Sequence, residues 1–184
     1  MRKWILIVLG TLFGLLVLGC AAIFAMGMSA DANRLSNSIV IHQKPEAVWP
    51  WLYKPDKVKQ WVTWLVDIRD EAGPHDEPVV GGKAVWIMED KNNNNARMEI
   101  TGVVKAVELH RRLEVALSAP EGFKGTSTYA LTPLPDGSTR LDSDSRYEFD
   151  NAFARFMTPL ICWQAKKKMV DDQSHLAKLV ESAK

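Results

Sequence analysis

The strongest constraint on the fold is the stretch of residues 38–64, where a short apolar strand runs directly into short helices. Ile39 and Ile41 alternate with residues of different character, as in a half-buried strand. Pro45 has the fixed φ angle and the missing amide donor that a first helical position tolerates. A second short helix is expected from Pro55 to residue 61 or 64. The stretch therefore predicts a strand followed by two short helices.

These residues resemble the opening of the START-like superfamily, also called SRPBCC, which includes the polyketide cyclase/dehydrase families. Chains of that superfamily begin with the pattern I-x-A-P-x-x-V-W-x-x-L and carry a tryptophan after a second short helix. The residues that match this pattern here are Ile41, Pro45, Val48, Trp49, Leu52 and Trp61. Lys44 stands where the family usually has a small residue or proline, which is a minor departure.

The order of the remaining elements continues the resemblance over about residues 36–183. After an irregular segment at 70–82, runs typical of strands alternate with turn signals. The expected strands are 83–90, 97–108 with a bend near Gly102, 111–118, 126–132 and 139–149, and a turn is expected at 91–95. A helix of about thirty residues then closes the sequence, because apolar residues recur at three- and four-residue steps. These apolar residues are Ile161, Ala165, Met169, Leu176, Leu179 and Ala183.

The resemblance implies an α+β helix-grip fold of the START-like class. In that fold a curved antiparallel sheet wraps around the long C-terminal helix and leaves a cavity between them. We expect this domain at residues 36–184, preceded by one N-terminal transmembrane helix at 1–28 and a short polar linker at 29–35.

The membrane prediction rests on residues 4–28, which contain no charged side chain and are long enough to cross a bilayer. Arg2 and Lys3 precede this run, so the positive-inside rule places the N-terminus in the cytoplasm. The expected location is the cell inner membrane, with a single pass and the domain extracytoplasmic, in the periplasm of a bacterium.

Two processed forms of this segment remain open alternatives to an uncleaved anchor. Val17-Leu-Gly-Cys20 is a loose lipobox, although the following residues stay apolar where a lipoprotein would turn polar. Ala30-Asp-Ala32 has the small-x-small spacing of a signal-peptidase site, although the apolar run is long for a signal peptide.

Composition allows one domain and argues against a nucleic-acid partner. Of the 184 residues, 23 are Lys or Arg and 22 are Asp or Glu. Setting Arg2 and Lys3 aside leaves 21 basic against 22 acidic residues, a net charge of −1 for the soluble part. The basic run 166–168 is interpreted as a solvated helix face or as a contact with anionic lipid headgroups. The oligomeric state is left open.

The sequence lacks an identifiable catalytic or metal-binding motif. Its histidines are scattered, at His42, His75, His110 and His175. Cys20 lies in the apolar segment and Cys162 on the final helix, where a buried small hydrophobic role is expected. We therefore expect no cofactor and no metal, and favour a protein that is not an enzyme.

The expected site is the cavity between sheet and final helix. Along strand 139–149, Arg140, Asp142, Asp144 and Arg146 share one solvated face, while hydroxyl and apolar side chains share the other. Small hydroxyls among apolar groups are typical of ligand pockets. The predicted ligand-binding residues are Trp86, Met88, Met98, Leu117, Tyr129, Ser143, Ser145, Tyr147, Phe156, Leu160 and Asp172.

Two helix residues leave alternatives open. Asp172 occupies an apolar-stripe position, where a carboxylate must be paired or protonated, so it is either a partner of Lys168 at the rim or a polar anchor in the pocket. Pro159 predicts a kink in the helix, or a helix start with Thr158 as N-cap.

Taken together, the sequence predicts a membrane-tethered SRPBCC domain that binds a hydrophobic or amphipathic, lipid-like small molecule. The alternatives are a polyketide cyclase or hydrolase-type enzyme and an envelope interaction or stress module with a vestigial cavity.

Overall fold

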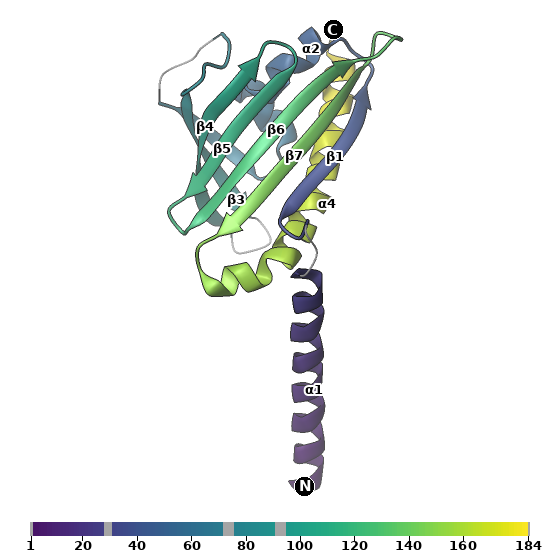
Figure 1. Ribbon diagram of the computed structural model, residues 1–184, viewed down its shortest axis with the longest axis vertical. Coiled ribbons are helices and arrows are strands. Elements are labelled where there is room, and N and C mark those ends of the chain that lie inside the picture. Colours follow the sequence, from purple (N-terminus) through teal and green to yellow (C-terminus); the bar gives the residue numbers. More distant parts are fainter. Residues whose placement is uncertain (1, 28–30, 72–75, 91–94, 184) are drawn as a thin grey trace.

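The computed structural model describes residues 2–27, 31–71, 76–90 and 95–183. The first helix, α1 (Arg2–Gly27), projects as a rod from one end of a domain that contains all other elements (Figure 1). Of the sequence predictions, His75, most of the turn at 91–95 and part of the linker at 29–35 lie outside the described residues.

The domain begins with a strand and three short helical segments, as the opening motif predicts. These are β1 (Arg34–Ile41), α2 (Pro45–Val48), the 3-10 helix η1 (Trp49–Leu52) and α3 (Pro55–Trp61). Proline occupies an early position in each helical segment, where its missing amide donor is tolerated. Six further strands and the long C-terminal helix follow: β2 (Leu65–Asp70), β3 (Lys83–Asp90), β4 (Ala96–Glu108), β5 (Arg112–Ala119), β6 (Phe123–Pro133), β7 (Thr139–Phe149) and α4 (Ala152–Ser182).

All seven strands form one antiparallel sheet with the order β1-β7-β6-β5-β4-β3-β2. The sheet curves around α4, which lies on its inner face (Figure 1). The helix-grip prediction is therefore confirmed, together with strands 83–90 and 139–149, whose observed bounds match the predicted ones.

Three differences from the sequence prediction have physical causes. The first strand begins at Arg34, inside the predicted linker, because Leu35 is buried and pairs with Ser145 of β7. Strand β2 was not predicted, because its residues 65–70 mix charged and apolar side chains and are mostly exposed. The irregularity in β4 lies between Val104 and Ala106 rather than at Gly102, and it is a bulge in the register with β5.

Helix α4 starts at Ala152, where the Asn151 side chain accepts a hydrogen bond of 2.7 Å from the amide of Ala154. Pro159 therefore lies inside the helix, and the alternative of a start capped by Thr158 is wrong. Figure 1 shows that the first turns of α4 run across the end of the domain beside α1, after which the helix turns and runs along the sheet. Proline removes one backbone hydrogen bond and is the usual cause of such a bend.

The close-packed core lies at the end of the domain away from α1. It is built by the short helices, the adjoining ends of the strands and the last turns of α4. Its buried members are Ile41, Val48, Trp49, Trp51, Leu52, Trp61, Leu113, Leu131, Leu141, Leu176 and Val180. Outside this core, inward residues of β1 and β7 such as Leu35 and Ser145 are also buried, whereas Trp86, Met88 and Met98 on β3 and β4 keep part of their surface exposed.

Candidate ligand-binding site

The inner face of the sheet is covered unevenly. Helix α4 packs mainly against β1 and β7, whose inward residues Leu35, Leu141 and Ser145 are buried. The inward residues of β3, β4 and β5 are less protected: Trp86 and Leu117 are half-buried, and Met98 keeps 40% of its surface exposed. A site on the inner face is therefore expected over these strands rather than over β7.

A cavity of about 280 Å³ lies on this less protected side. Its floor is the inner face of β3, β4 and β5, its wall is formed by η1 and the start of α3, and residues 76–79 close one side. The apolar lining residues are Leu52, Tyr53, Pro55, Pro78, Val79, Ala84, Trp86, Val104, Leu113 and Val115. Its size is near the lower end of the range for small-molecule sites, and its lining is mostly apolar, as such sites usually are.

Polar groups gather at the edge of this cavity. Two rings, Trp49 in η1 and Tyr53 directly after it, hold residues 76–77 in place. The Tyr53 hydroxyl donates to the Asp76 carbonyl at 2.6 Å, and Trp49 Nε1 donates to Glu77 Oε2 at 2.8 Å. Burial and the nearby Glu77 charge raise the pKa of Tyr53 to about 12, so its hydroxyl stays protonated at neutral pH. Lys54 and Lys83 lie at the same edge. The arrangement suits a ligand with an apolar body and a polar end.

The predicted hydroxyl residues form a separate group on β6 and β7. Ser145 is buried and its Oγ lies 2.8 Å from Ser127 Oγ, its partner across the strands. Ser143, 3% exposed, has a buried Oγ without a hydrogen-bond partner among the described residues. Burial raises the pKa values of Tyr129 and Tyr147. None of Tyr129, Ser143 and Ser145 lines the 280 Å³ cavity, so their role in ligand binding stays a prediction.

Gly125 explains how the Tyr147 ring is accommodated in this group. A Cβ atom at Gly125 would lie 2.9 Å from Tyr147 Cδ1 and 2.9 Å from the Arg146 carbonyl oxygen. Both distances are shorter than a normal contact, so glycine lets the ring of Tyr147 lie against the backbone of β6.

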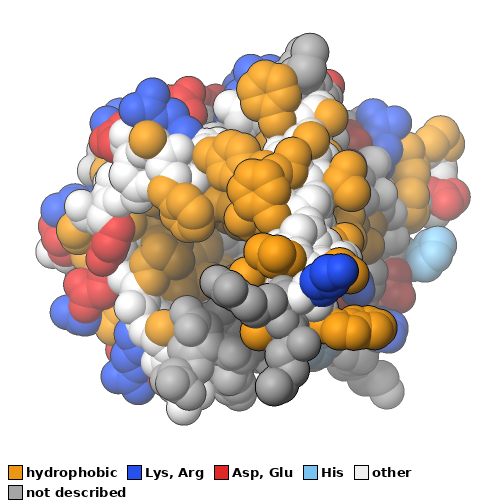
Figure 2. Space-filling view, turned by 90° about the horizontal axis from the view of Figure 1, so that it is seen from below, with side chains coloured by type: hydrophobic (Ala, Val, Ile, Leu, Met, Phe, Trp, Pro, Cys, Tyr) orange, Lys and Arg blue, Asp and Glu red, His pale blue; other side chains and the backbone are white. Residues whose placement is uncertain are grey.

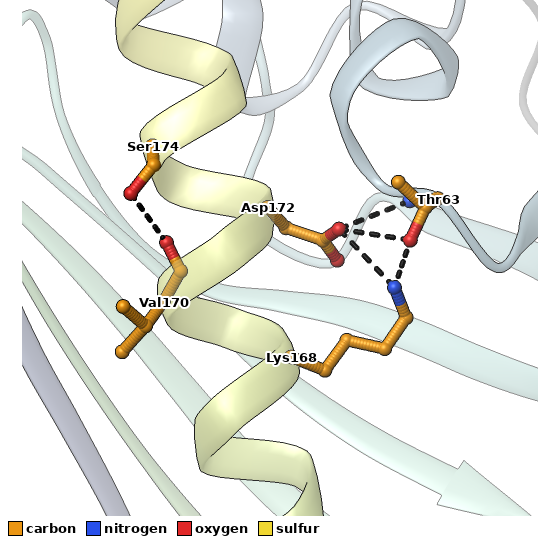
Figure 3. Close-up of polar contacts among 5 residues, drawn as sticks. All are labelled: Thr63, Lys168, Val170, Asp172 and Ser174. Carbon is orange, nitrogen blue, oxygen red and sulfur yellow. Dashed lines mark hydrogen bonds and ion pairs between the residues drawn. The ribbon is translucent and has the colours of Figure 1, made fainter.

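Asp172 is tied to the neighbouring elements, as Figure 3 shows. It is 7% exposed and accepts hydrogen bonds from the Thr63 hydroxyl at 2.9 Å and from Lys168 Nζ at 3.2 Å. Lys168 also contacts the Thr63 hydroxyl. The prediction of a Lys168 partner is confirmed, and the carboxylate fastens α4 to the segment between α3 and β2.

Two other predicted residues lie at the end of the domain beside α1. Tyr147 and Phe156 line an open groove of about 770 Å³ between α1, β7 and α4. Leu160 is half-buried on the next turn of α4, and Met88 pairs with Met98 across β3 and β4. The structure thus places the eleven predicted residues in several locations rather than in one pocket, and only Trp86 lines the cavity.

Several contributing residues were not predicted. Ser127 has the same phase as Tyr129 and Leu131, so extending the alternation by one step would have found it. Glu77 and Thr63 lie in connecting segments without periodicity, and no sequence signal indicated them.

The remaining side chains that could take part in a reaction, Cys162, His110 and the outward charges of β7, make packing or ion-pair contacts. Cys162 is buried, and burial raises its pKa to about 11, which makes it a poor nucleophile. The ring of His110 makes an edge contact with Trp49 at a centroid distance of 6.1 Å. The outward charges of β7 pair locally, for example Arg140 with Asp142 at 2.9 Å, which confirms the solvated face.

The curved antiparallel sheet, the long C-terminal helix held on its inner face and the cavity beside them define the helix-grip, START-like class of proteins. The family model described as "Polyketide cyclase / dehydrase and lipid transport" matches residues 33–181. The chain belongs to this family.

Solved structures agree with this fold at low sequence identity. A protein from Rhodobacter sphaeroides has a TM-score of 0.64 at 20% identity, over 83% of this chain and 95% of that one. A START superfamily protein from Mycobacterium smegmatis has a TM-score of 0.58 at 17% identity, over 80% and 94%. A protein from Chromobacterium violaceum has a TM-score of 0.63 at 17% identity, over 82% and 99%. No curated protein matched the chain.

Proposed function

We propose that this protein is a membrane-anchored SRPBCC domain that binds a hydrophobic or amphipathic, lipid-like small molecule. The observation that carries the proposal is the cavity of about 280 Å³ over β3, β4 and β5. Its apolar interior would remove a hydrocarbon or ring system from water, which is favourable in proportion to the apolar area buried. The polar groups at its edge would remain in contact with the polar end of the ligand.

The anchor in this proposal is α1. Its segment Lys3–Gly27 has a mean hydropathy of 2.6 over 18 residues, and none of that window is buried in the protein. An apolar helix whose side chains are not buried in the protein is stable when lipid surrounds it. With Arg2 and Lys3 on the cytoplasmic side, the domain would lie in the periplasm of a bacterium.

The function is tested by filling the cavity. Val104 lines the cavity, whereas the side chain of Val103, the preceding residue on the same strand, points to the opposite face of the sheet. We expect Val104→Phe to abolish saturable binding of an apolar fluorescent probe while leaving the melting temperature nearly unchanged, because an empty cavity accepts added volume. Val103→Phe is the matched control and should bind the probe as the wild type does. Equal binding by wild type and Val104→Phe would contradict the proposed site.

A further inference from the structure

The first half of α4, residues 152–167, has an unusual position and surface. Figure 1 shows its first turns running across the end of the domain, beside the end of α1. The two helices touch: a Cβ atom at Gly27 would lie 3.4 Å from Pro159 Cγ. If α1 spans the bilayer, this part of α4 lies at the level where the chain leaves the membrane.

Large apolar side chains of this segment are exposed. Phe153 is 74% exposed, Trp163 58% and Phe156 37%. Phe153 and Phe156 are three residues apart, which places them on one side of the first turns, and Trp163 follows Pro159 one turn later. Figure 2 views this end of the molecule with α1 projecting towards the viewer, so the apolar side chains of α1 contribute to the hydrophobic area near its centre, and charged side chains lie around the margin. A group of exposed aromatic residues such as Phe153, Phe156 and Trp163 marks an interaction surface.

The charge of the segment indicates which kind of partner this surface would bind. Residues 152–170 contain Arg155, Lys166, Lys167 and Lys168 and no Asp or Glu. Lys166 and Lys167 are exposed and form no ion pair among the described residues. A basic helix with an aromatic face is the pattern of helices that lie in the membrane interface, and tryptophan favours the headgroup level.

We propose that segment 152–167 is an interfacial membrane helix. It places Phe153, Phe156 and Trp163 into the outer edge of the bilayer, with Lys166 and Lys167 at anionic headgroups. The proposal rests on α1 as a transmembrane anchor. It fixes the orientation of the domain, because the end that carries the groove of about 770 Å³ then faces the lipid surface.

Spin labels on the full-length chain test this position. In a Cys20→Ala background, a label at Phe153→Cys is compared with one at Leu109→Cys, which lies 55% exposed in the β4–β5 turn at the other end of the domain. The chain is reconstituted in nanodiscs of phosphatidylcholine with phosphatidylglycerol. The label at 153 should be relaxed by oxygen in preference to a water-soluble nickel chelate, and the label at 109 should show the reverse. Cys162 is buried and should take no label, and the Cys20→Ala background without an added cysteine is the control for this.

Two results would overturn the proposal. Equal access of the nickel chelate to both labels would mean that segment 152–167 is in water. Protection of label 153 from both reagents would mean that another protein surface, such as a second copy, covers it. Alkaline extraction of the cell membranes that contain the full-length chain reports on α1 independently, so failure of the anchor and failure of the docked helix are separate results.

A second measurement does not depend on the cysteine variants. Brominated lipids should quench the fluorescence of the wild type more than that of Trp163→Phe, and the difference is the signal of Trp163. Replacing Lys166 and Lys167 by Gln should weaken docking in anionic nanodiscs by about fivefold per lysine, the equivalent of about 1 kcal/mol each. In pure phosphatidylcholine the same variant should dock as the wild type does. An unchanged quenching in Trp163→Phe would contradict insertion of this side chain.

Discussion

Trp49 connects the opening motif to the rest of the domain. Its indole is 1% exposed, belongs to the main core and donates to Glu77 at the edge of the cavity. Trp49→Ala should lower the free energy of unfolding by about 3–5 kcal/mol, because a large buried side chain leaves a cavity behind. Denaturant unfolding of the full chain in detergent measures this, and Leu109→Ala on the surface should change it by no more than about 0.5 kcal/mol. A loss below about 1 kcal/mol for Trp49→Ala would mean that the first helices are wrongly placed.

Cys162 gives the protein a pH-dependent term in its stability. The thiol pKa is raised from 9.0 to about 11 by burial, so an unfolded chain loses this proton at a lower pH than the folded one. The unfolded state then binds fewer protons, and stability falls as pH rises from about 9 to 11, by at most about 1.4 kcal/mol per pH unit. Below pH 9 the term is constant. Cys162→Ala should remove this part of the slope and Cys20→Ala should keep it. Identical slopes for both variants would contradict the burial of the thiol.

The attachment of α4 to the segment between α3 and β2 depends on one carboxylate. Asp172→Ala removes the acceptor that Thr63 and Lys168 share, and should cost about 1–3 kcal/mol of unfolding free energy. Thr63→Val should cost less, and the double variant should cost less than the sum, because both changes remove the same interaction. Asp171→Ala, on the exposed neighbouring position, is the control. Additive effects of Thr63→Val and Asp172→Ala would show that the two residues do not interact.

Elements with a clear period could be predicted from the sequence, and connections could not. Strand 139–149 alternates charged and uncharged residues without interruption, and its bounds and inward face follow from that pattern. Strand β2 is an edge strand of the sheet with little buried surface, so it has no such period. The bend in α4 could be expected from Pro159, whereas its direction, across the end of the domain beside α1, depends on packing that no local pattern records.

The site was harder to predict than the fold for the same reason. A strand's period gives the face of a side chain, so Trp86 and Ser145 were both expected to point inwards. It does not give how closely α4 approaches each strand. Because α4 packs on β1 and β7, Ser145 is enclosed in the packed interior, while Trp86 borders the open cavity.

The proposed orientation of the whole chain rests on its charges at the N-terminus. Reporter fusions at the C-terminus should behave as extracytoplasmic, because by the positive-inside rule Arg2 and Lys3 favour a cytoplasmic N-terminus. Alkaline phosphatase, active only outside the cytoplasm, and a cytoplasmic fluorescent protein form the matched pair of reporters. Fluorescence from the C-terminal fusion, with an inactive phosphatase, would reverse the topology.

The central claim is that the domain carries an apolar or amphipathic small molecule in the cavity over β3, β4 and β5. Native mass spectrometry of the full-length chain, extracted from membranes in detergent, tests it most directly. The wild type and Val103→Phe should show the same discrete added mass, and Val104→Phe should lack it, because its ring occupies the space of the ligand. An identical spectrum for all three proteins, with or without added masses, would contradict the claim that this cavity is a ligand-binding site.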